Sequence, residues 1–345
     1  MRWIDEGNAV AYLREQGWLP EGVRGDATTL SGGVSNVVLR IQRDDGRADV
    51  ILKQVREQLR TPDPWFSQPD RILKEMDVLR ILQEILPAGS VPTILWEDRA
   101  NYLFVMEAIE PGHRVWKNCL LAGEVDLGIG ERLGMLLAKV HAGTIGNEQL
   151  REQFGDLRMF DELRVDPYYR RLWRDFPEER NSLQKLIDDS LTHRISLVLA
   201  DFSPKNILIH SGGVTLVDFE TGHFGDPAFD LGFFLSHLSL KTILHAGRAD
   251  EYFQLIERFL AAYRQELGDV QRFATEGVPL EQRGIQHLAG CMWARVDGTS
   301  RVDYLNSDSQ KDLVRRFCRG LFHSPAPSWT ETFTRLAEEI RKTYS

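Results

Sequence analysis

The sequence predicts an α+β fold with two lobes: a small lobe with an antiparallel sheet over residues 1–110, and a larger helical lobe over residues 111–345. Three observations support this prediction. The length of 345 residues exceeds that of a typical single domain. The first third alternates short β-rich runs with turn residues. The remainder is dominated by apolar residues at helical spacing, interrupted by one strand-and-loop patch at 195–225.

In the small lobe, a short opening helix precedes β-rich runs at 37–41 and 49–55, which flank a turn at 44–46. Helical spacing then predicts a helix after Pro69, with Asp70 as its N-cap. Two further strands are predicted at 93–96 and 102–106. The segment 107–112 ends in Pro-Gly and is predicted to be an extended connector.

In the large lobe, apolar residues over 127–140 predict a buried helix. The charged and aromatic segment 147–180 contains Pro167 and Pro177, which we expect to interrupt regular structure, and its shape is not predicted. The later helices are predicted at 227–244, 249–267, 279–296, 308–322 and 329–343.

Composition and charge exclude several classes of protein. Apolar residues make up 42% and charged residues 27%, as in ordinary globular proteins. The 42 basic and 51 acidic residues give a net charge of −9, which argues against a nucleic-acid partner. No run approaches the roughly 18 apolar residues of a membrane helix, and the first residues do not resemble a signal peptide. The three cysteines match no zinc pattern, and their odd number predicts a reducing, cytoplasmic location.

Three polar residues in the catalytic-loop candidate 199–220 form the strongest chemical signal. Asp201 and Asn206 lie five residues apart between two apolar runs, and Asp218 ends the next β-rich run. Phosphoryl transfer needs a carboxylate near the attacking hydroxyl and hard oxygen ligands for Mg²⁺ beside the ATP phosphates. Taken singly, each residue is more simply a turn or strand-end residue. Their order and spacing together favour the phosphoryl-transfer interpretation.

Upstream residues supply candidates for nucleotide binding. Glycines at 32 and 33 let the backbone approach phosphates closely, although Gly-Gly between strands is often only a turn. Lys53 lies among apolar strand residues and needs either solvent or an anion. Glu75 lies along the apolar stripe of its helix, so Lys53 is its natural partner. The alternatives are an edge-strand lysine and a solvent-facing glutamate. The candidate nucleotide-binding residues are Gly32, Gly33, Ser35, Asn36, Lys53, Glu75, Glu107 and Ile109.

These motifs, with the run Gly-Asp-Pro-Ala-Phe-Asp-Leu-Gly at 225–232, resemble the aminoglycoside phosphotransferase and choline kinase superfamily over nearly the whole chain. The resemblance implies a bilobal protein-kinase-like fold that uses ATP and Mg²⁺. It implies that Asp201 is the catalytic base and that Asn206 and Asp218 are Mg²⁺ ligands. Lys53, held by Glu75, would bind the α- and β-phosphates.

The resemblance also assigns supporting roles. Adenine would lie against the backbone near Glu107 and Ile109, with ATP between the lobes, and Asp230 would brace the catalytic loop. Two departures from the family pattern stand out. The usual His-Gly before the catalytic Asp is Leu199-Ala200 in this sequence. Lys205 occupies a position that often holds Gly; it is either a phosphate-contacting group or a solvent-facing loop lysine.

A narrower likeness is to 5-methylthioribose kinases. It includes Leu-Lys-Gln at 52–54, Arg60, Pro-Trp at 64–65 and the region 289–303. That family has a neighbouring pair of arginines at the substrate pocket, whereas this chain has Ala294-Arg295. It also has Ser where this chain has Asn206, and Asp-Pro-Glu where this chain has Asp-Phe-Glu at 218–220. The candidate substrate residues are Trp293, Arg295 and Asp297, which could equally form a charged loop between helices.

The sequence therefore predicts an ATP-dependent kinase that phosphorylates a hydroxyl of a small metabolite or antibiotic, with a sugar such as methylthioribose as one possible acceptor. The main alternative is a non-catalytic, pseudokinase-like module that binds nucleotide. A protein kinase is disfavoured because only eleven residues separate Asp218 from Asp230, too few for an activation loop. The sequence does not identify the acceptor or the oligomeric state.

Overall fold

The computed structural model describes residues 1–30, 36–56 and 68–344, which form two compact units. The first unit comprises Met1–His113 and His210–Glu220, and the second comprises Arg114–Ile209 and Thr221–Ser345. The predicted α+β class is confirmed. The segment that carries Asp218 groups with the first unit, although the sequence suggested that it belongs with the helical lobe.

The first unit is built on a five-stranded antiparallel sheet with strand order β1-β2-β3-β5-β4. The strands are β1 (Gly25–Thr29), β2 (Asn36–Arg43), β3 (Val50–Val55), β4 (Ile94–Asp98) and β5 (Leu103–Glu107). The predicted strands are confirmed, with small differences at their ends. Lys53 pairs in register with Val38 on one side and Phe104 on the other, so it lies on a central strand. The alternative of an edge-strand lysine is thereby excluded.

Two helices accompany this sheet, α1 (Ala9–Glu15) and α2 (Arg71–Ile85). From α1, Tyr12 and Leu13 pack in one apolar core with Leu39 and Leu52 of the sheet. Helix α2 contacts β3 and β4 and carries Glu75. Asp70 precedes α2 as predicted, but its side chain makes no capping hydrogen bond because its backbone is already helical. That detail of the prediction is wrong.

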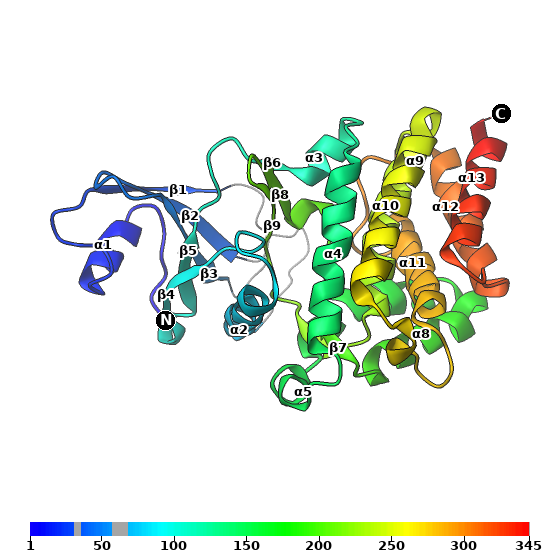
Figure 1. Cartoon of the computed structure of the whole chain (residues 1–345), viewed down its shortest axis with the longest axis horizontal. Helices are drawn as coiled ribbons and strands as arrows, with labels where there is room; N and C mark the ends of the chain where they lie inside the picture. The colour runs from blue at the N-terminus through cyan, green and yellow to red at the C-terminus, as the bar shows by residue number, and fades with distance from the viewer. Residues whose placement is uncertain (31–35, 57–67, 345) are drawn as a thin grey trace. The chain divides into compact units, whose positions relative to one another are not determined.

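The second unit is mainly helical, and its long helices lie side by side (Figure 1). They are α4 (Leu127–Thr144), α9 (Ala228–Leu244), α10 (Ala249–Leu267), α11 (Leu280–Asp297), α12 (Asp308–His323) and α13 (Trp329–Tyr344). The five predicted C-terminal helices agree with these to within one residue at each end. Shorter elements are β6 (Arg114–Val115), α3 (Trp116–Leu121), α5 (Glu148–Phe154), α8 (Arg180–Thr192), β7 (Ser196–Val198), β8 (Ile207–His210) and β10 (His223–Gly225). The strand β9 (Gly213–Leu216) belongs to the first unit.

Two glycines permit close contacts between the long helices. A Cβ atom on Gly134 of α4 would lie 2.3 Å from the carbonyl oxygen of Phe259 in α10. A Cβ atom on Gly232 of α9 would lie 2.5 Å from the backbone nitrogen of Leu288 in α11. Such separations are shorter than van der Waals contact, so any side chain at either position would force the helices apart.

The segment 147–180 is helical rather than irregular. After α5 come α6 (Arg158–Phe160), a π-helix (Asp161–Arg170) and α7 (Arg171–Asp175). Pro167 lies inside the π-helix, so the expectation that it interrupts regular structure is wrong. Proline removes one backbone donor, and π-helical turns are often found at functional sites, where such irregularity is tolerated. Pro177 follows the end of α7 and starts a short 3-10 turn, so it interrupts the helix as expected.

Cys119, Cys291 and Cys318 are buried and unbridged, as expected. Across residues 1–30, 36–56 and 68–344, no helix combines the length and apolar character needed to cross a membrane.

Candidate active site

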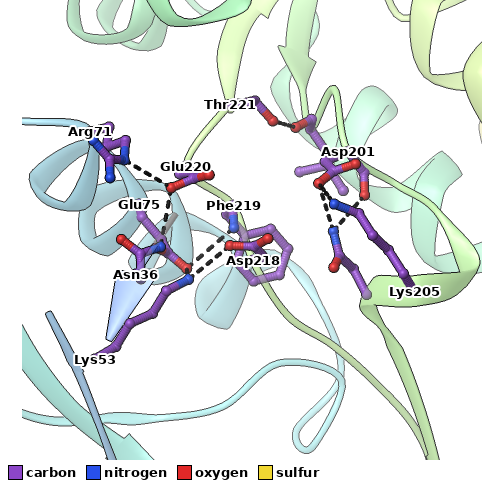
Figure 2. Close-up of polar contacts among 12 residues, drawn as sticks. Asn36, Lys53, Arg71, Glu75, Asp201, Lys205, Asp218, Phe219, Glu220 and Thr221 are labelled. Carbon is purple, nitrogen blue, oxygen red and sulfur yellow. Dashed lines mark hydrogen bonds and ion pairs between the residues drawn. The ribbon is translucent and has the colours of Figure 1, made fainter. Parts of the chain in front are cut away.

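The first unit contains a buried cluster of charged side chains centred on Lys53 (Figure 2). The Lys53 ammonium lies 2.6 Å from Glu75 Oε1 and 2.8 Å from Asp218 Oδ1. Glu75 Oε1 also accepts a hydrogen bond from the backbone N–H of Phe219, at 3.3 Å. The predicted Lys53–Glu75 pair is therefore present. It joins β3 and α2 to the Asp-Phe-Glu segment.

A second ion pair extends this cluster. Arg71 donates to Glu220 Oε2 at 3.2 Å, and the Asn36 amide donates to the same oxygen at 3.2 Å. The cluster thus contains three carboxylates, those of Glu75, Asp218 and Glu220, against two cations. Its formal charge is one negative unit. Asn36 Oδ1 and Glu75 Oε2 are buried and have no hydrogen-bond partner among residues 1–30, 36–56 and 68–344.

Burial and neighbouring charges act on the ionisation of this cluster. Burial alone would lower the pKa of Lys53, but the carboxylates of Asp218, Glu75 and Glu220 outweigh it and raise that pKa above its ordinary value. Burial raises the pKa of Glu75, assisted by Asp218 and Glu220, while Lys53 opposes the shift. Lys53 is therefore a fixed cation.

In the second unit, Asp201 is 7% exposed and both of its carboxylate oxygens have partners. Arg164 lies 2.9 Å from Oδ1, and Lys205 lies 2.8 Å from Oδ2. The Asn206 amide donates to Oδ2 at 2.9 Å and to the Asp201 carbonyl oxygen at 3.1 Å. Because Asn206 uses its NH₂ group in this way, its amide oxygen remains the candidate metal ligand. Figure 2 shows Asp201 beside the more exposed Lys205.

Arg164 is a site residue that the sequence did not reveal. It lies on the π-helix, and its Nε donates to the Ala200 carbonyl oxygen at 2.6 Å while its other nitrogens reach Asp201 and the Leu163 carbonyl oxygen. Arg164 is far from the catalytic loop in sequence, in a segment whose shape was not predicted. What distinguishes Arg164 from the other arginines of this charged segment is its burial. Burial is not visible in a single sequence.

The backbone before Asp201 is held by Asp230, as the resemblance implies. Asp230 Oδ2 accepts from Leu199 N–H at 2.8 Å, and Oδ1 accepts from Ala200 N–H at 2.7 Å. Ala200 has φ of 56°, a left-handed conformation that disfavours side chains. The two bonds maintain this conformation in the absence of the glycine typical of the family. His141 lies 3.2 Å from Asp230 Oδ2 and occupies a supporting, buried position.

We predict that Asp230→Asn lowers kcat by about 10- to 100-fold with little change in KM, because small displacements of a reacting group are costly. An asparagine has one acceptor oxygen and cannot hold both backbone N–H groups. Steady-state kinetics at a temperature below unfolding would measure this split. The matched control is Asp226→Asn: Asp226 is equally buried but binds Arg283 at 2.7 and 2.9 Å. Equal kcat values for the two variants would contradict a positioning role for Asp230.

The predicted substrate residues do not gather as a group. Trp293 is fully buried, and its indole N–H donates to Asp297 Oδ2 at 2.8 Å. Asp297 in turn pairs with Arg315 of α12 at 2.7 Å. These two side chains therefore join α11 to α12, and their contact with a substrate stays a prediction. Arg295 differs, since it donates to the Tyr168 hydroxyl at 3.1 Å and has an unpartnered Nε.

The structure describes only some of the residues expected to bind the nucleotide. Gly32, Gly33 and Ser35 lie outside the described residues, as do Arg60 and the Pro-Trp pair at 64–65. Glu107 N–H donates to the Thr93 carbonyl oxygen at 2.9 Å. A cavity of about 640 Å³ in the first unit is lined by Glu107 and Ile109 together with Trp18 and Arg43. It includes none of Lys53, Glu75 or Asp218, so we do not take it as the phosphate site.

Comparison with known proteins adds a family match. The model of the phosphotransferase enzyme family matches residues 26–274, well over half of the chain. A methylthioribose kinase of Yersinia pestis is 27% identical over 320 residues, covering 82% of this chain and 75% of that protein. Methylthioribose kinase 1 of Oryza sativa is 24% identical over 283 residues, covering 72% of this chain. The chain spans 65% of the length of the rice relative.

The fold also resembles solved structures. A choline/ethanolamine kinase family protein from Mesorhizobium loti superposes with a TM-score of 0.53 at 18% identity, covering 96% of this chain and 98% of that one. At this level of identity the likeness concerns the fold, which is the protein-kinase-like fold that the sequence predicted.

Proposed function

The chain belongs to the phosphotransferase enzyme family, and from this premise we propose that it is a small-molecule kinase that transfers the γ-phosphoryl group of ATP to a hydroxyl of a small sugar or polyol. The observation that carries the proposal is Asp201, a buried carboxylate whose two oxygens are both oriented by neighbouring side chains. A protein that only binds nucleotide has no use for such a carboxylate. Neither the family match nor the relatives' names support a non-catalytic module.

In this mechanism Asp201 accepts the proton of the acceptor hydroxyl. Arg164 and Asn206 hold the carboxylate in one orientation. Oδ2 already accepts from both Asn206 and Lys205, so Oδ1 is the oxygen proposed to take the hydroxyl proton. A positioned base of this kind contributes about 10²–10⁴-fold to the rate. The remaining acceleration comes from orientation of the reactants and from charge stabilisation.

Lys205 would stabilise negative charge on the transferred phosphoryl group. Its side chain is 53% exposed and pairs with Asp201 Oδ2 at 2.8 Å. An exposed ion pair is weak, so the flexible lysine can exchange this partner for a phosphate oxygen without a large cost. This dual contact explains why lysine, rather than the more usual glycine, suits the position.

Lys53 would bind the α- and β-phosphates, with Glu75 holding it and the backbone near Glu107 and Ile109 receiving adenine. Asn206 and Asp218 would hold Mg²⁺, since an amide oxygen and a carboxylate are suitable hard ligands. When bound, Mg²⁺ neutralises charge on the phosphate oxygens. The negative formal charge of the Lys53 cluster and the unpartnered Glu75 Oε2 fit a cation at this place.

The proposed acceptor class rests on the relatives. Proteins named methylthioribose kinase align with 72–82% of this chain, and these names favour a sugar. The net charge of −9 would suit a cationic acceptor, but it describes the whole chain and not the surroundings of Asp201. The unbridged cysteines are compatible with the proposed cytoplasmic location.

The test is ADP release with Mg²⁺-ATP across a panel of acceptors: methylthioribose, other pentoses, sugar acids and sugar phosphates, an aminoglycoside, choline and homoserine. We expect one class to stimulate ADP release well above the acceptor-free rate, with a phosphorylated product visible by mass spectrometry. Stimulation by a protein substrate alone, or ATP binding without any stimulated release, would contradict the proposal.

A further inference from the structure

Five cationic side chains lie near one another in the second unit, and we call them the cationic cluster. The members are Lys117, Arg164, Lys205, Lys241 and Arg295. Four of them act on His237: after burial, the charges of Arg295, Lys241, Lys205 and Arg164 lower its pKa well below its ordinary value. Lys117 and Arg295 act in the same sense on Lys241. Arg164 pairs with Asp201, and Asp303 acts on the neighbouring Tyr304. Positive charge from several side chains therefore acts on His237 and Lys241.

Lys241 is the most unusual member of the cationic cluster. It lies on α9, is 1% exposed, and donates to the carbonyl oxygen of His237 at 3.2 Å. Its ammonium lies 5.3 Å from the centre of the Tyr304 ring. Within the described ranges of the chain, no carboxylate forms an ion pair with it. Burial and the neighbouring cations lower the pKa of Lys241 to about 7. The amine is held by a backbone carbonyl and the face of a ring, and an anion bound beside it would hold it in the charged form.

Two polar atoms beside Lys241 have no hydrogen-bond partner among the residues that the structure describes. They are the buried Tyr304 hydroxyl and the Nε of Arg295. The other Arg295 contacts are neutral hydroxyl groups, at 3.1 Å for Tyr168 and 2.7 Å for Ser300. An ammonium, a guanidinium and a hydroxyl are together the donor set that binds a carboxylate or a phosphate.

The cationic cluster is connected to the proposed base through Phe233. The Phe233 ring contacts the His237 ring, with centroids 4.9 Å apart, one helical turn before Lys241. The guanidinium of Arg164 lies 5.3 Å from the same Phe233 ring and binds Asp201. The unpartnered donors and the catalytic carboxylate thus belong to one contiguous set of contacts within this unit.

We propose that the acceptor carries an anionic group, a carboxylate or a phosphate, in addition to the hydroxyl that is phosphorylated, and that Lys241, Arg295 and Tyr304 bind this group. The inference rests on the proposed function, because it names the acceptor of the same site. Tyr304 lies in the irregular segment between α11 and α12, so its side chain can turn from Lys241 to admit the anion. The same charges disfavour cationic acceptors such as aminoglycosides and choline.

The test compares matched probes that differ in one anionic group: ribose 5-phosphate against ribose, and gluconate against glucitol. Isothermal titration calorimetry measures their binding to the full chain with a non-hydrolysable ATP analogue present, so the measurement does not depend on turnover. We expect the anionic member of at least one pair to bind roughly 10- to 100-fold more tightly, as charged hydrogen bonds predict. The first pair reports a phosphate site and the second a carboxylate site.

Lys241→Met should abolish this preference, while the control Lys185→Met, on an exposed face of α8, should preserve it. Because methionine removes an uncompensated buried charge, Lys241→Met should also fold with an unchanged or higher Tm. The inference is overturned if neither anionic probe binds better than its neutral partner, or if Lys241→Met keeps the preference. Turnover of a neutral sugar without anion preference would overturn this inference alone. Anion preference without any acceptor-stimulated ADP release would instead overturn the proposed function.

Discussion

Replacing Asp201 by asparagine is expected to lower kcat by about 10²–10⁴-fold, the contribution of a positioned general base. Asparagine keeps the size of the side chain but cannot take the hydroxyl proton. ATP binding should persist, because Lys53 and Asp218, which we propose for the phosphates and the metal, belong to a different cluster of contacts. Acceptor-stimulated ADP release measures kcat, and nucleotide titration measures binding.

The Asp201→Asn variant needs a control for local disruption. Both carboxylate oxygens face donors in the wild type, so the new NH₂ group would lie against Arg164 or Lys205. Thermal unfolding reports this effect separately from catalysis. Asp188→Asn, an exposed position on α8, serves as the matched control and should leave kcat unchanged. A folded Asp201→Asn variant with a kcat within threefold of wild type would mean that another group accepts the proton.

The Lys53→Met variant should lose both activity and stability. Removing one partner from a buried ion pair typically costs about 3–5 kcal/mol, because the remaining charges lack compensation. In this chain the loss leaves Glu75 and Asp218 facing each other without their cation. Activity falls because the proposed phosphate contact is absent. Urea unfolding measures the free energy of unfolding, and ADP release measures activity.

A double variant separates these two effects. Adding Glu75→Gln to Lys53→Met removes one uncompensated buried charge, so part of the lost stability should return, with a coupling of about 0.5–3 kcal/mol. Activity should not return, since the cation is still missing. The control Lys139→Met disrupts the half-exposed pair with Glu266 and should cost less than about 1 kcal/mol. Additive destabilisation in the double variant would contradict the structural coupling, and activity restored by Glu75→Gln would contradict the role of Lys53.

Much of the fold was predictable because the determining signals are local. Apolar spacing identified the helices of the second unit, and the strands lie close to their predicted positions. The spacing of Asp201, Asn206 and Asp218 identified the chemistry without any view of burial. The pairing of Lys53 with Glu75 was predicted correctly because each is a charged residue on an apolar face. Burying either charge alone is costly, and an ion pair between the two offsets that cost.

The errors and omissions concern residues whose role depends on distant neighbours. Trp293 and Asp297 were predicted to contact a substrate, and the structure adds that they bind each other and Arg315, which follows 18 residues later. Arg164 reaches Asp201 from a π-helix 37 positions earlier in the sequence, which no local pattern reports. Pro167 was expected to end regular structure, whereas the π-helix continues through it.

The sequence by itself determined the fold class, the order of the elements and the identity of the groups proposed for phosphoryl transfer, because periodicity and motif spacing are properties of neighbouring residues. Only the tertiary structure decided which charges are compensated. In the folded chain Arg164 and Lys205 pair with Asp201, and Arg315 pairs with Asp297. Lys241 is buried, and no carboxylate of the described residues forms an ion pair with it. Compensation of charge depends on distances between residues far apart in sequence and on burial, and both arise only when the chain is folded.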